Sequence, residues 1–164
     1  MKRRYLLEAG TATLAVWGVA RYLSSYPTPM TSKSETFEVT KTDAEWCATL
    51  TPEQYKVLRQ HGTERSHMSP LDKQYGAGEY HCAGCDLPLF SSATKFNSGT
   101  GWPSFYDPLP QAIATSVDRS FFMTRVEVHC RRCGGHLGHV FDDGPAPTGK
   151  RYCMNGVSLK FIPA

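Results

Sequence analysis

The spacing of apolar residues along the chain changes from a helical period to a strand period. Over residues 51–62, Tyr55, Leu58 and Val57 fall on one side of a short helix. The expected end signals of that helix are an N-cap, a proline in the first turn, a glutamine three residues after the cap and a terminating glycine: Thr51, Pro52, Gln54 and Gly62. A weaker helical turn is expected over residues 43–49, capped by Thr42.

From residue 79 onward, apolar and polar residues alternate, which is typical of half-buried strands. Two segments show this most clearly, with apolar positions Val126, Val128, Cys130 and Val157, Leu159, Phe161, and polar positions Arg125, Glu127, His129 and Ser158, Lys160. Shorter strand candidates lie at 79–82, 87–90, 111–115 and 136–141. No spacing indicates a helical crossover between strands, so the fold class is mainly β, with antiparallel sheets.

The N-terminal segment differs from the rest of the chain. Lys2, Arg3 and Arg4 precede an apolar stretch of residues 9–20, which is shorter than the ~20 residues that cross a bilayer. Residues 1–23 therefore resemble a twin-arginine export leader, with an uncleaved anchor or a basic tail as alternatives. The leader predicts a periplasmic or membrane-associated protein, and without it the alternative is the cytoplasm.

The Ser-, Thr- and Pro-rich residues 24–36 indicate a linker, so a single domain is expected over residues 37–164. A length of 164 residues, 40% hydrophobic content and 20% charged content suit one globular domain, which we expect to be a monomer. The net charge of +3 is too small and too dispersed to indicate a nucleic-acid partner.

Four of the six cysteines form two C-x-x-C pairs, Cys82 with Cys85 and Cys130 with Cys133, separated by residues 86–129. Two such turns supply the four sulfurs of a tetrahedral Zn²⁺ site. With all four ligands supplied by protein, one structural zinc ion per chain is expected. Two disulfides are the alternative that an oxidising compartment favours.

The remaining cysteines are Cys47, in a helical pattern, and Cys153, two residues after Arg151. A neighbouring positive charge lowers the pKa of a thiol, which favours Cys153 as a nucleophile, whereas a small buried hydrophobic residue is the alternative. The spacing of His136 and His139 lets both imidazoles face one cavity. Trp102, in a glycine-rich loop, is either a binding surface or a side chain that fixes the loop.

Four segments together resemble the methionine-R-sulfoxide reductase (MsrB) family: CAGCDLPLF, KFNSGTGWPSF, CRRCGGHLGHVFDDGP and RYCMNGVSLKF. The resemblance covers about residues 43–162, with every segment in order. It implies two antiparallel sheets in a β-tent, short N-terminal helices and a structural tetracysteine zinc site. It also implies reduction of the R epimer of methionine sulfoxide in oxidised proteins and peptides, with electrons from thioredoxin-like thiols.

The same resemblance implies a role for individual residues. Cys153 is implied as the nucleophile, which attacks the sulfoxide sulfur and becomes a sulfenic acid. Trp102 is implied as the contact of the substrate methyl group. The polar side of the pocket is implied to consist of His136, His139, Arg151 and Asn155, and the zinc ligands are Cys82, Cys85, Cys130 and Cys133.

Two positions depart from the family pattern. Thr100 occupies the position where many members have the cysteine that resolves the sulfenic acid. Cys47 is the spare thiol, and it either resolves the sulfenic acid or is a bystander while an external thiol acts directly. Gly156 replaces a serine common in relatives, which predicts a freer loop. A non-catalytic zinc module that binds peptides is the competing hypothesis, and under it Cys153 is dispensable.

Overall fold

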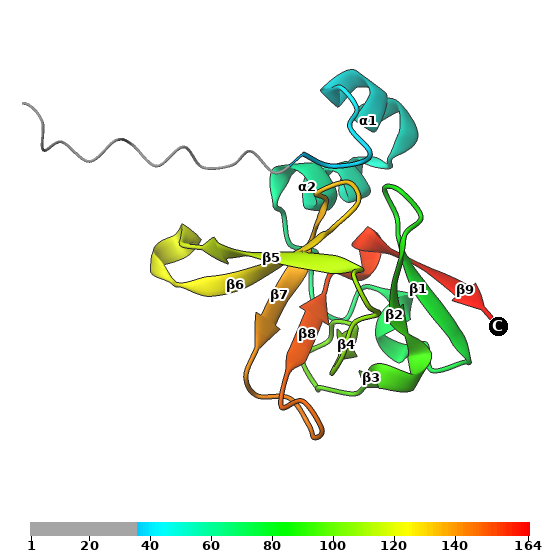
Figure 1. The fold of residues 1–164 in the computed structure, drawn as a ribbon, viewed down its shortest axis with the longest axis vertical. Helices are drawn as coiled ribbons and strands as arrows, with labels where there is room; N and C mark the ends of the chain where they lie inside the picture. Colours follow the sequence, from blue (N-terminus) through cyan, green and yellow to red (C-terminus); the bar gives the residue numbers. More distant parts are fainter. Residues whose placement is uncertain (1–35) are drawn as a thin grey trace, which may run out of the picture. The chain divides into compact units, whose positions relative to one another are not determined.

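The protein is described by a computed structural model that covers residues 36–164 (Figure 1). The expected export leader at 1–23, and the expected linker at 24–36 except for Thr36, lie outside the described residues. Within residues 36–164, no helix combines the length and the apolar character needed to span a membrane.

Two short helices open the domain, as the sequence predicts. α1 (Asp43–Thr49) and α2 (Pro52–Gln60) each begin with a capping box, in which the cap hydroxyl and the side chain three residues later satisfy each other's backbone N–H. The end of α2 differs from the prediction by one residue. His61, not Gly62, takes the left-handed conformation, with φ of 53°, and Gly62 N–H donates to the Lys56 carbonyl.

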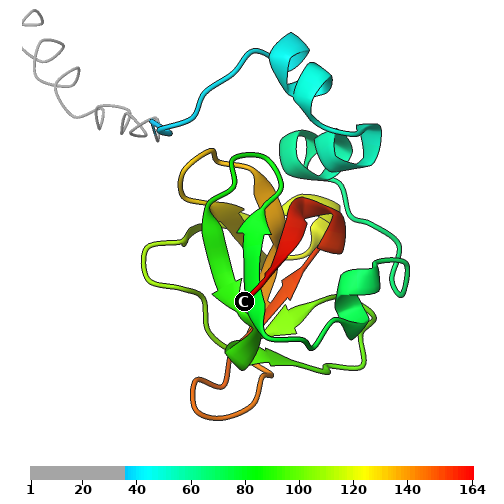
Figure 2. The same cartoon turned by 90° about the vertical axis from the view of Figure 1, so that its right-hand side faces the viewer.

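The strands form two antiparallel sheets, so the predicted fold class is confirmed (Figures 1 and 2). The three-stranded sheet has the order β2 (Pro88–Ser91), β1 (Gly78–Cys82), β9 (Leu159–Pro163). The six-stranded sheet has the order β3 (Lys95–Phe96), β4 (Ser104–Phe105), β8 (Arg151–Met154), β7 (His136–Phe141), β6 (Arg125–Cys130), β5 (Ile113–Asp118). Short 3₁₀ turns lie at Pro70–Lys73, Ser92–Thr94, Ser120–Phe122 and Gly156–Ser158.

The hydrophobic core draws on strands of both sheets. Phe105 of β4 stacks on Phe90 of β2, with ring centroids 4.4 Å apart, and meets Tyr80 of β1 edge-on at 4.9 Å. All three rings are fully buried, and burying a large apolar side chain stabilises the fold by about 1.5–3 kcal/mol. This aromatic cluster fixes the two sheets against each other and so positions the loops that connect them.

The predicted alternation along β6 is confirmed at Val128 and Cys130, which are fully buried, and is wrong at Val126 and on the polar face. Val126 is 42% exposed, whereas Glu127 and His129 are buried. The reason is that the face expected to meet solvent is covered: His61, after α2, contacts Glu127, and the ring of Phe37 packs edge-on against His129. Local alternation cannot reveal a cover that comes from distant residues.

Two other predicted strands are shifted. Residues 156–158 form a 3₁₀ turn, so the last strand begins at Leu159 and not at Val157. The strand predicted at 111–115 begins only at Ile113 and continues to Asp118, because Gln111 takes a left-handed conformation with φ of 56° that ends any extended pairing.

Candidate active site and metal centre

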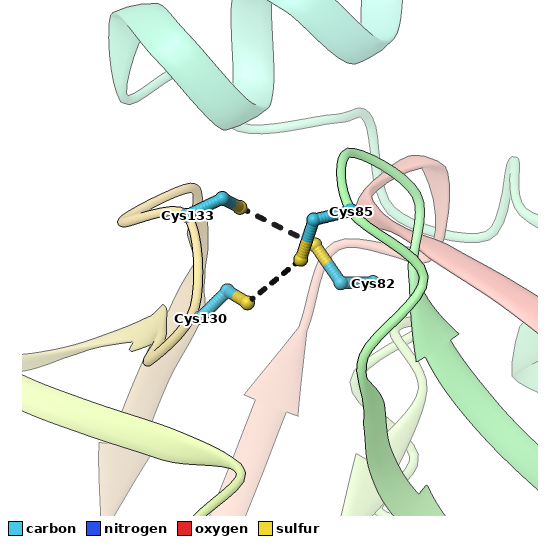
Figure 3. Close-up of side chains that lie close together, drawn as sticks. All are labelled: Cys82, Cys85, Cys130 and Cys133. Carbon is cyan, nitrogen blue, oxygen red and sulfur yellow. Dashed lines mark hydrogen bonds between the residues drawn. The ribbon is translucent and has the colours of Figure 1, made fainter. Parts of the chain in front are cut away.

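The two C-x-x-C pairs meet at one end of the domain (Figure 3). Cys82 and Cys85 come from the turn between β1 and β2, and Cys130 and Cys133 come from the turn between β6 and β7. The four sulfurs lie within 4.8 Å of one another, with Sγ–Sγ distances of 3.7 Å for Cys82–Cys133 and 3.5 Å for Cys85–Cys130.

These sulfur positions fit a bound metal ion. A tetrahedral site with metal–sulfur bonds of ~2.3 Å has sulfurs about 3.8 Å apart, close to the spacing found, whereas a disulfide needs about 2.05 Å. Each of these two distances joins a sulfur of one C-x-x-C pair to a sulfur of the other pair. Four thiolates so close together would repel one another strongly, and a divalent cation removes that repulsion. The cluster therefore fits a structural metal site that connects the two sheets.

The helices close this end of the molecule. Trp46 of α1 is buried against the Cys82–Cys85 turn, where a Cβ on Gly84 would lie 3.6 Å from its ring and 3.6 Å from Cys133 Sγ. Arg59 of α2 donates to the Cys133 carbonyl at 2.9 Å. Cys82, Cys130 and Cys133 are buried, so the surroundings leave little space for a substrate beside the sulfurs.

A second group of side chains forms one row across the six-stranded sheet. Residues directly opposite each other in antiparallel strands project from the same face. The strand register gives such a row from β3 to β5: Phe96, Ser104, Cys153, His139, Glu127 and Ser116. Six short segments spread from residue 96 to residue 153 therefore present side chains on one face of the sheet, with Cys153 between Ser104 and His139.

Cys153 faces a partly enclosed pocket of about 150 Å³. Thr100 Oγ1 lies 3.8 Å from its Sγ. Burial raises the pKa of the Cys153 thiol, opposed by Thr100, by the charge of Arg151 and by Ser104. The sequence predicts a lowered pKa, and this is wrong in its net direction. Arg151 does act in the predicted sense, but a bidentate pair with Asp143 at 2.8 Å shares its charge, and burial of the thiol outweighs it.

His139 lines the same pocket and is held by a carboxylate. Its Nε2 lies 2.8 Å from Asp118 Oδ2, at the end of β5, and Arg125 donates to the same carboxylate at 2.6 Å. Backbone and side-chain hydrogen bonds with Ser120, and the bond with His139, hold the pKa of Asp118 far below its usual range. Burial lowers the pKa of His139, although Asp118 opposes this. The ring is therefore neutral near pH 7, with its Nε2–H directed to Asp118.

His136 lies behind His139 and not in the pocket wall. Its ring is only 2% exposed, and the two ring centroids are 5.4 Å apart. Nδ1 of His136 lies 2.7 Å from Glu127 Oε1, and His61 Nδ1 lies 2.9 Å from the same oxygen. Burial raises the pKa of Glu127, but hydrogen bonds from His136 and Ser116 outweigh it and bring the pKa to about 2. Glu127 is thus an anionic anchor for two imidazoles.

Trp102 and Asn155 line the pocket and are fixed by Glu64. Trp102 Nε1 donates to the Glu64 carbonyl at 3.2 Å, and Glu64 N–H donates to Asn155 Oδ1 at 2.9 Å. Asn155 Nδ2 donates in turn to the Leu137 carbonyl at 3.0 Å. The carboxylate of Glu64 accepts the backbone N–H groups of Gly156 and Val157. A single residue therefore positions the indole and the amide relative to each other.

Among the described residues, the pocket is lined by four of the predicted site residues: Cys153, His139, Asn155 and Trp102. His136 and Arg151 are turned instead toward their carboxylate partners. Cys47 is exposed on α1, beside Trp46 at the metal end, and is not part of the pocket wall. The structure therefore does not bring the spare thiol to Cys153.

Comparison with known proteins agrees with this geometry. Residues 50–163 match the model of the SelR domain family. The chain is 60% identical to the peptide methionine sulfoxide reductase MsrB of Methanosarcina barkeri over 124 residues, which is 75% of this chain and 87% of the relative. This chain belongs to the MsrB family.

The similarity to MsrB proteins extends across distant organisms. The MsrB of Thiobacillus denitrificans is 56% identical over 75% of this chain and 94% of its own length. The chloroplastic peptide methionine sulfoxide reductase B1 of Arabidopsis thaliana is 46% identical over 96% of this chain and 79% of its own length. The chain thus spans most of the length of these MsrB proteins.

Sequence reasoning missed three acidic residues of this MsrB-family site: Glu64, Asp118 and Glu127. Each lies outside the four family segments, and a single carboxylate in a chain with 15 acidic residues gives no local signal. Gly156 also has a different role from the one expected. A Cβ there would lie 1.9 Å from Ser69 Oγ, so the glycine permits close packing and not loop freedom.

Proposed function

We propose that this protein reduces the R epimer of methionine sulfoxide in oxidised proteins and peptides, with Cys153 as the nucleophile. The observation that carries the proposal is the position of Cys153 in a small pocket that Trp102 and His139 also line, in a chain of the MsrB family. An oxidised methionine side chain has an apolar methyl group and a polar S=O, and the indole and the imidazole match these two ends.

The reaction transfers one oxygen atom. The sulfur of Cys153 attacks the sulfoxide sulfur, the S=O bond breaks, and the oxygen ends on Cys153 as a sulfenic acid while methionine leaves. The thiol proton is retained in the sulfenic acid, so the step is balanced without another reactant. Two external thiols then reduce the sulfenic acid to the thiol, forming one disulfide and one water molecule.

His139 is the proposed proton carrier in this step. Because its Nε2–H is directed to Asp118, its Nδ1 can accept the thiol proton and pass it to the departing oxygen. Asn155 is the proposed donor to that oxygen through the second N–H of its amide. Removing one such preorganised donor lowers kcat by about 10²–10³-fold in well-studied enzymes.

The other predicted residues receive supporting roles. Trp102 is proposed to hold the methyl group and thereby select the epimer, since Glu64 fixes the orientation of the indole. His136 is proposed to support the ring of His139 from behind. Arg151 is proposed to favour the thiolate of Cys153, because its guanidinium opposes the effect of burial on the thiol pKa.

Zinc is the proposed metal of the tetracysteine site. A set of four thiolates in tetrahedral spacing is the donor set that zinc takes in structural sites. Once bound, the ion supplies cross-linking between the two sheets and no step of the reaction.

Direct reduction by an external, thioredoxin-like thiol is the proposed route of regeneration. Thr100 stands beside Cys153 where many relatives have a resolving cysteine, and Cys47 lies outside the pocket wall. We also propose that the protein acts as a monomer and is exported through residues 1–23. N-terminal sequencing of the mature protein tests the export proposal.

Incubation of the purified, metal-loaded protein with each methionine sulfoxide epimer and dithiothreitol tests the activity. The expected result is conversion of the R epimer alone, measured as methionine by chromatography. Conversion of only the S epimer, or of neither, contradicts the proposal. Replacement of Cys47 by serine should leave the thioredoxin-driven rate unchanged, whereas a slower rate would assign a resolving role to Cys47.

A further inference from the structure

Three hydroxyl groups form a continuous hydrogen-bonded chain that ends at Cys153. Thr100 Oγ1 is 3.8 Å from Cys153 Sγ, Ser98 Oγ is 2.8 Å from Thr100 Oγ1, and Ser104 Oγ is 2.7 Å from Ser98 Oγ. At the other end, Ser104 Oγ lies 3.1 Å from the carbonyl oxygen of Trp102. We call Thr100, Ser98 and Ser104 the hydroxyl chain.

The local backbone holds these groups in place. Gly99 and Gly101 take left-handed conformations, with φ of 74° and 84°, on either side of Thr100. Ser98 Oγ also accepts the backbone N–H of Thr100 at 3.4 Å, and Ser104 is fully buried opposite Cys153. The hydroxyl chain therefore runs from Cys153 to the backbone carbonyl of Trp102, which lines the pocket.

The hydroxyl chain can adopt two arrangements, one for the thiol and one for the thiolate of Cys153. A hydroxyl donates once and can accept twice. When Cys153 is a thiol, its S–H donates to Thr100, Thr100 to Ser98, Ser98 to Ser104, and Ser104 to the Trp102 carbonyl. When Cys153 is a thiolate, its proton has passed to a base, proposed above as His139, and Thr100 donates to the sulfur, Ser98 to Thr100 and Ser104 to Ser98, while the Trp102 carbonyl loses its donor. The thiol arrangement has four links and the thiolate arrangement three, so rotation of the three hydroxyls supplies a donor to the sulfur once the base has taken the thiol proton.

We propose that the hydroxyl chain sets the protonation state of Cys153, with Thr100 as the donor to the thiolate and Ser98 as a residue that positions Thr100. The proposal rests on the proposed function of Cys153 as the nucleophile. Thr100 thus has a role of its own in this protein, at the position where many family members have a second cysteine.

The surroundings of the thiol support this assignment. The hydrogen bond with Thr100 is the largest single contribution that opposes the effect of burial on the pKa of Cys153, and Arg151, whose guanidinium is paired with Asp143, also opposes it. In the low-dielectric pocket a hydroxyl donor to an anion is worth more than in water. Cooperative polarisation along the chain should strengthen the terminal bond to the sulfur.

The rate of alkylation of Cys153 by iodoacetamide, measured against pH, tests the hydroxyl chain. The full-length, metal-loaded protein should carry Cys47→Ser, so that Cys153 is the reactive thiol. Thr100→Val removes the hydroxyl at nearly constant shape and should slow alkylation about tenfold at pH 7, because a hydrogen bond to a charged group is lost. The midpoint of the pH profile should move upward by about one unit.

Two further variants separate the hydroxyl from its packing. Thr100→Ser keeps the donor and should restore the rate to within about threefold of the parent, since the chain stays complete. Ser98→Ala does not touch Cys153 but interrupts the chain, and it should move the midpoint in the same direction by less than Thr100→Val. Thr115→Val, on the exposed side of β5, is the matched control and should leave the profile unchanged.

An unchanged profile for Thr100→Val would overturn the proposal, and so would equal shifts for Thr100→Val and Thr100→Ser, which would indicate packing alone. Metal content and melting temperature show whether each variant is folded. If Thr100→Val does not fold, Ser98→Ala decides, and an unshifted midpoint there refutes the chain. Alkylation requires no sulfoxide, so these outcomes are independent of whether the parent protein reduces the R epimer.

Discussion

The tetracysteine site and the Cys153 pocket surround cysteine sulfurs in opposite ways. At the metal end, four sulfurs face one another within 4.8 Å and are closed over by Trp46 and α2. In the pocket, one sulfur faces hydroxyl groups, an imidazole and a partly open space of about 150 Å³.

The difference shows that the neighbours of a cysteine decide its role. Four converging thiols create a high density of negative charge once ionised, which a cation must neutralise, so they favour structure. A single thiol with donors on one side and space on the other can ionise and meet a substrate. The two sites are connected by β6 and β7, which begin or end at the metal cluster and carry Glu127 and His139.

Replacement of Cys153 by serine should give the largest functional effect of any single change. Loss of the attacking sulfur should lower the rate of R-sulfoxide reduction by roughly 10⁴-fold or more, while metal content and melting temperature stay at parent values. Product chromatography, elemental analysis and a thermal scan measure these three quantities. Cys47→Ser is the matched control, with full activity. Near-normal turnover by Cys153→Ser would support the non-catalytic metal module instead.

Replacement of Cys133 by serine should have the opposite effect to Cys153→Ser, because it should lower metal content and stability first. Removal of one of four ligands should lower the metal content and destabilise the domain by about 3 kcal/mol or more, or roughly 10 °C in melting temperature. Activity should fall only because the domain unfolds, so residual folded protein should still be alkylated at Cys153. Parent metal content and parent stability in this variant would show that the cluster does not hold the metal.

Acid should lower the stability of the folded protein by protonating Glu127. Its pKa lies at about 2, below the ordinary value of 4.5, so its stabilising contribution is complete above pH 4.5 and is lost as the pH falls toward 2. A loss of about 2 kcal/mol is expected over this window. Comparison of the parent with Glu127→Gln, by denaturant unfolding at several pH values, separates this effect from acid release of the metal. Parallel curves for the two proteins would refute it.

A second thiol introduced beside Cys153 should capture the sulfenic acid as a disulfide. Thr100→Cys places a sulfur where Oγ1 now lies, 3.8 Å from Cys153 Sγ. After R-sulfoxide treatment without reductant, the parent should hold a sulfenic acid that reacts with dimedone, whereas the variant should form a disulfide. Dimedone labelling should fall about tenfold, since the neighbouring thiol captures the sulfenic acid first. Equal labelling, measured by mass spectrometry, would show that the two sulfurs cannot meet.

Part of this site could be read from the sequence because the signals are local. The doubled C-x-x-C spacing predicts the metal cluster, and the threonine caps predict both helices, because each depends on residues a few positions apart. The polar row across the six-stranded sheet could not be predicted in this way. Its register is set by pairing between strands far apart in the chain, and β6 shows the consequence, since Glu127 and His129 are buried where alternation expects them exposed.

Short motifs with fixed spacing are enough to predict the tetracysteine cluster, the starts of both helices and the family. The direction in which the pKa of Cys153 shifts depends on the tertiary structure. Arg151, two residues away, predicts a lowered pKa for the thiol, yet burial raises it, and Asp143 shares the charge of Arg151. Desolvation depends on everything that surrounds a group in space, and Ser104 lies opposite Cys153 only because β4 and β8 pair in one particular register.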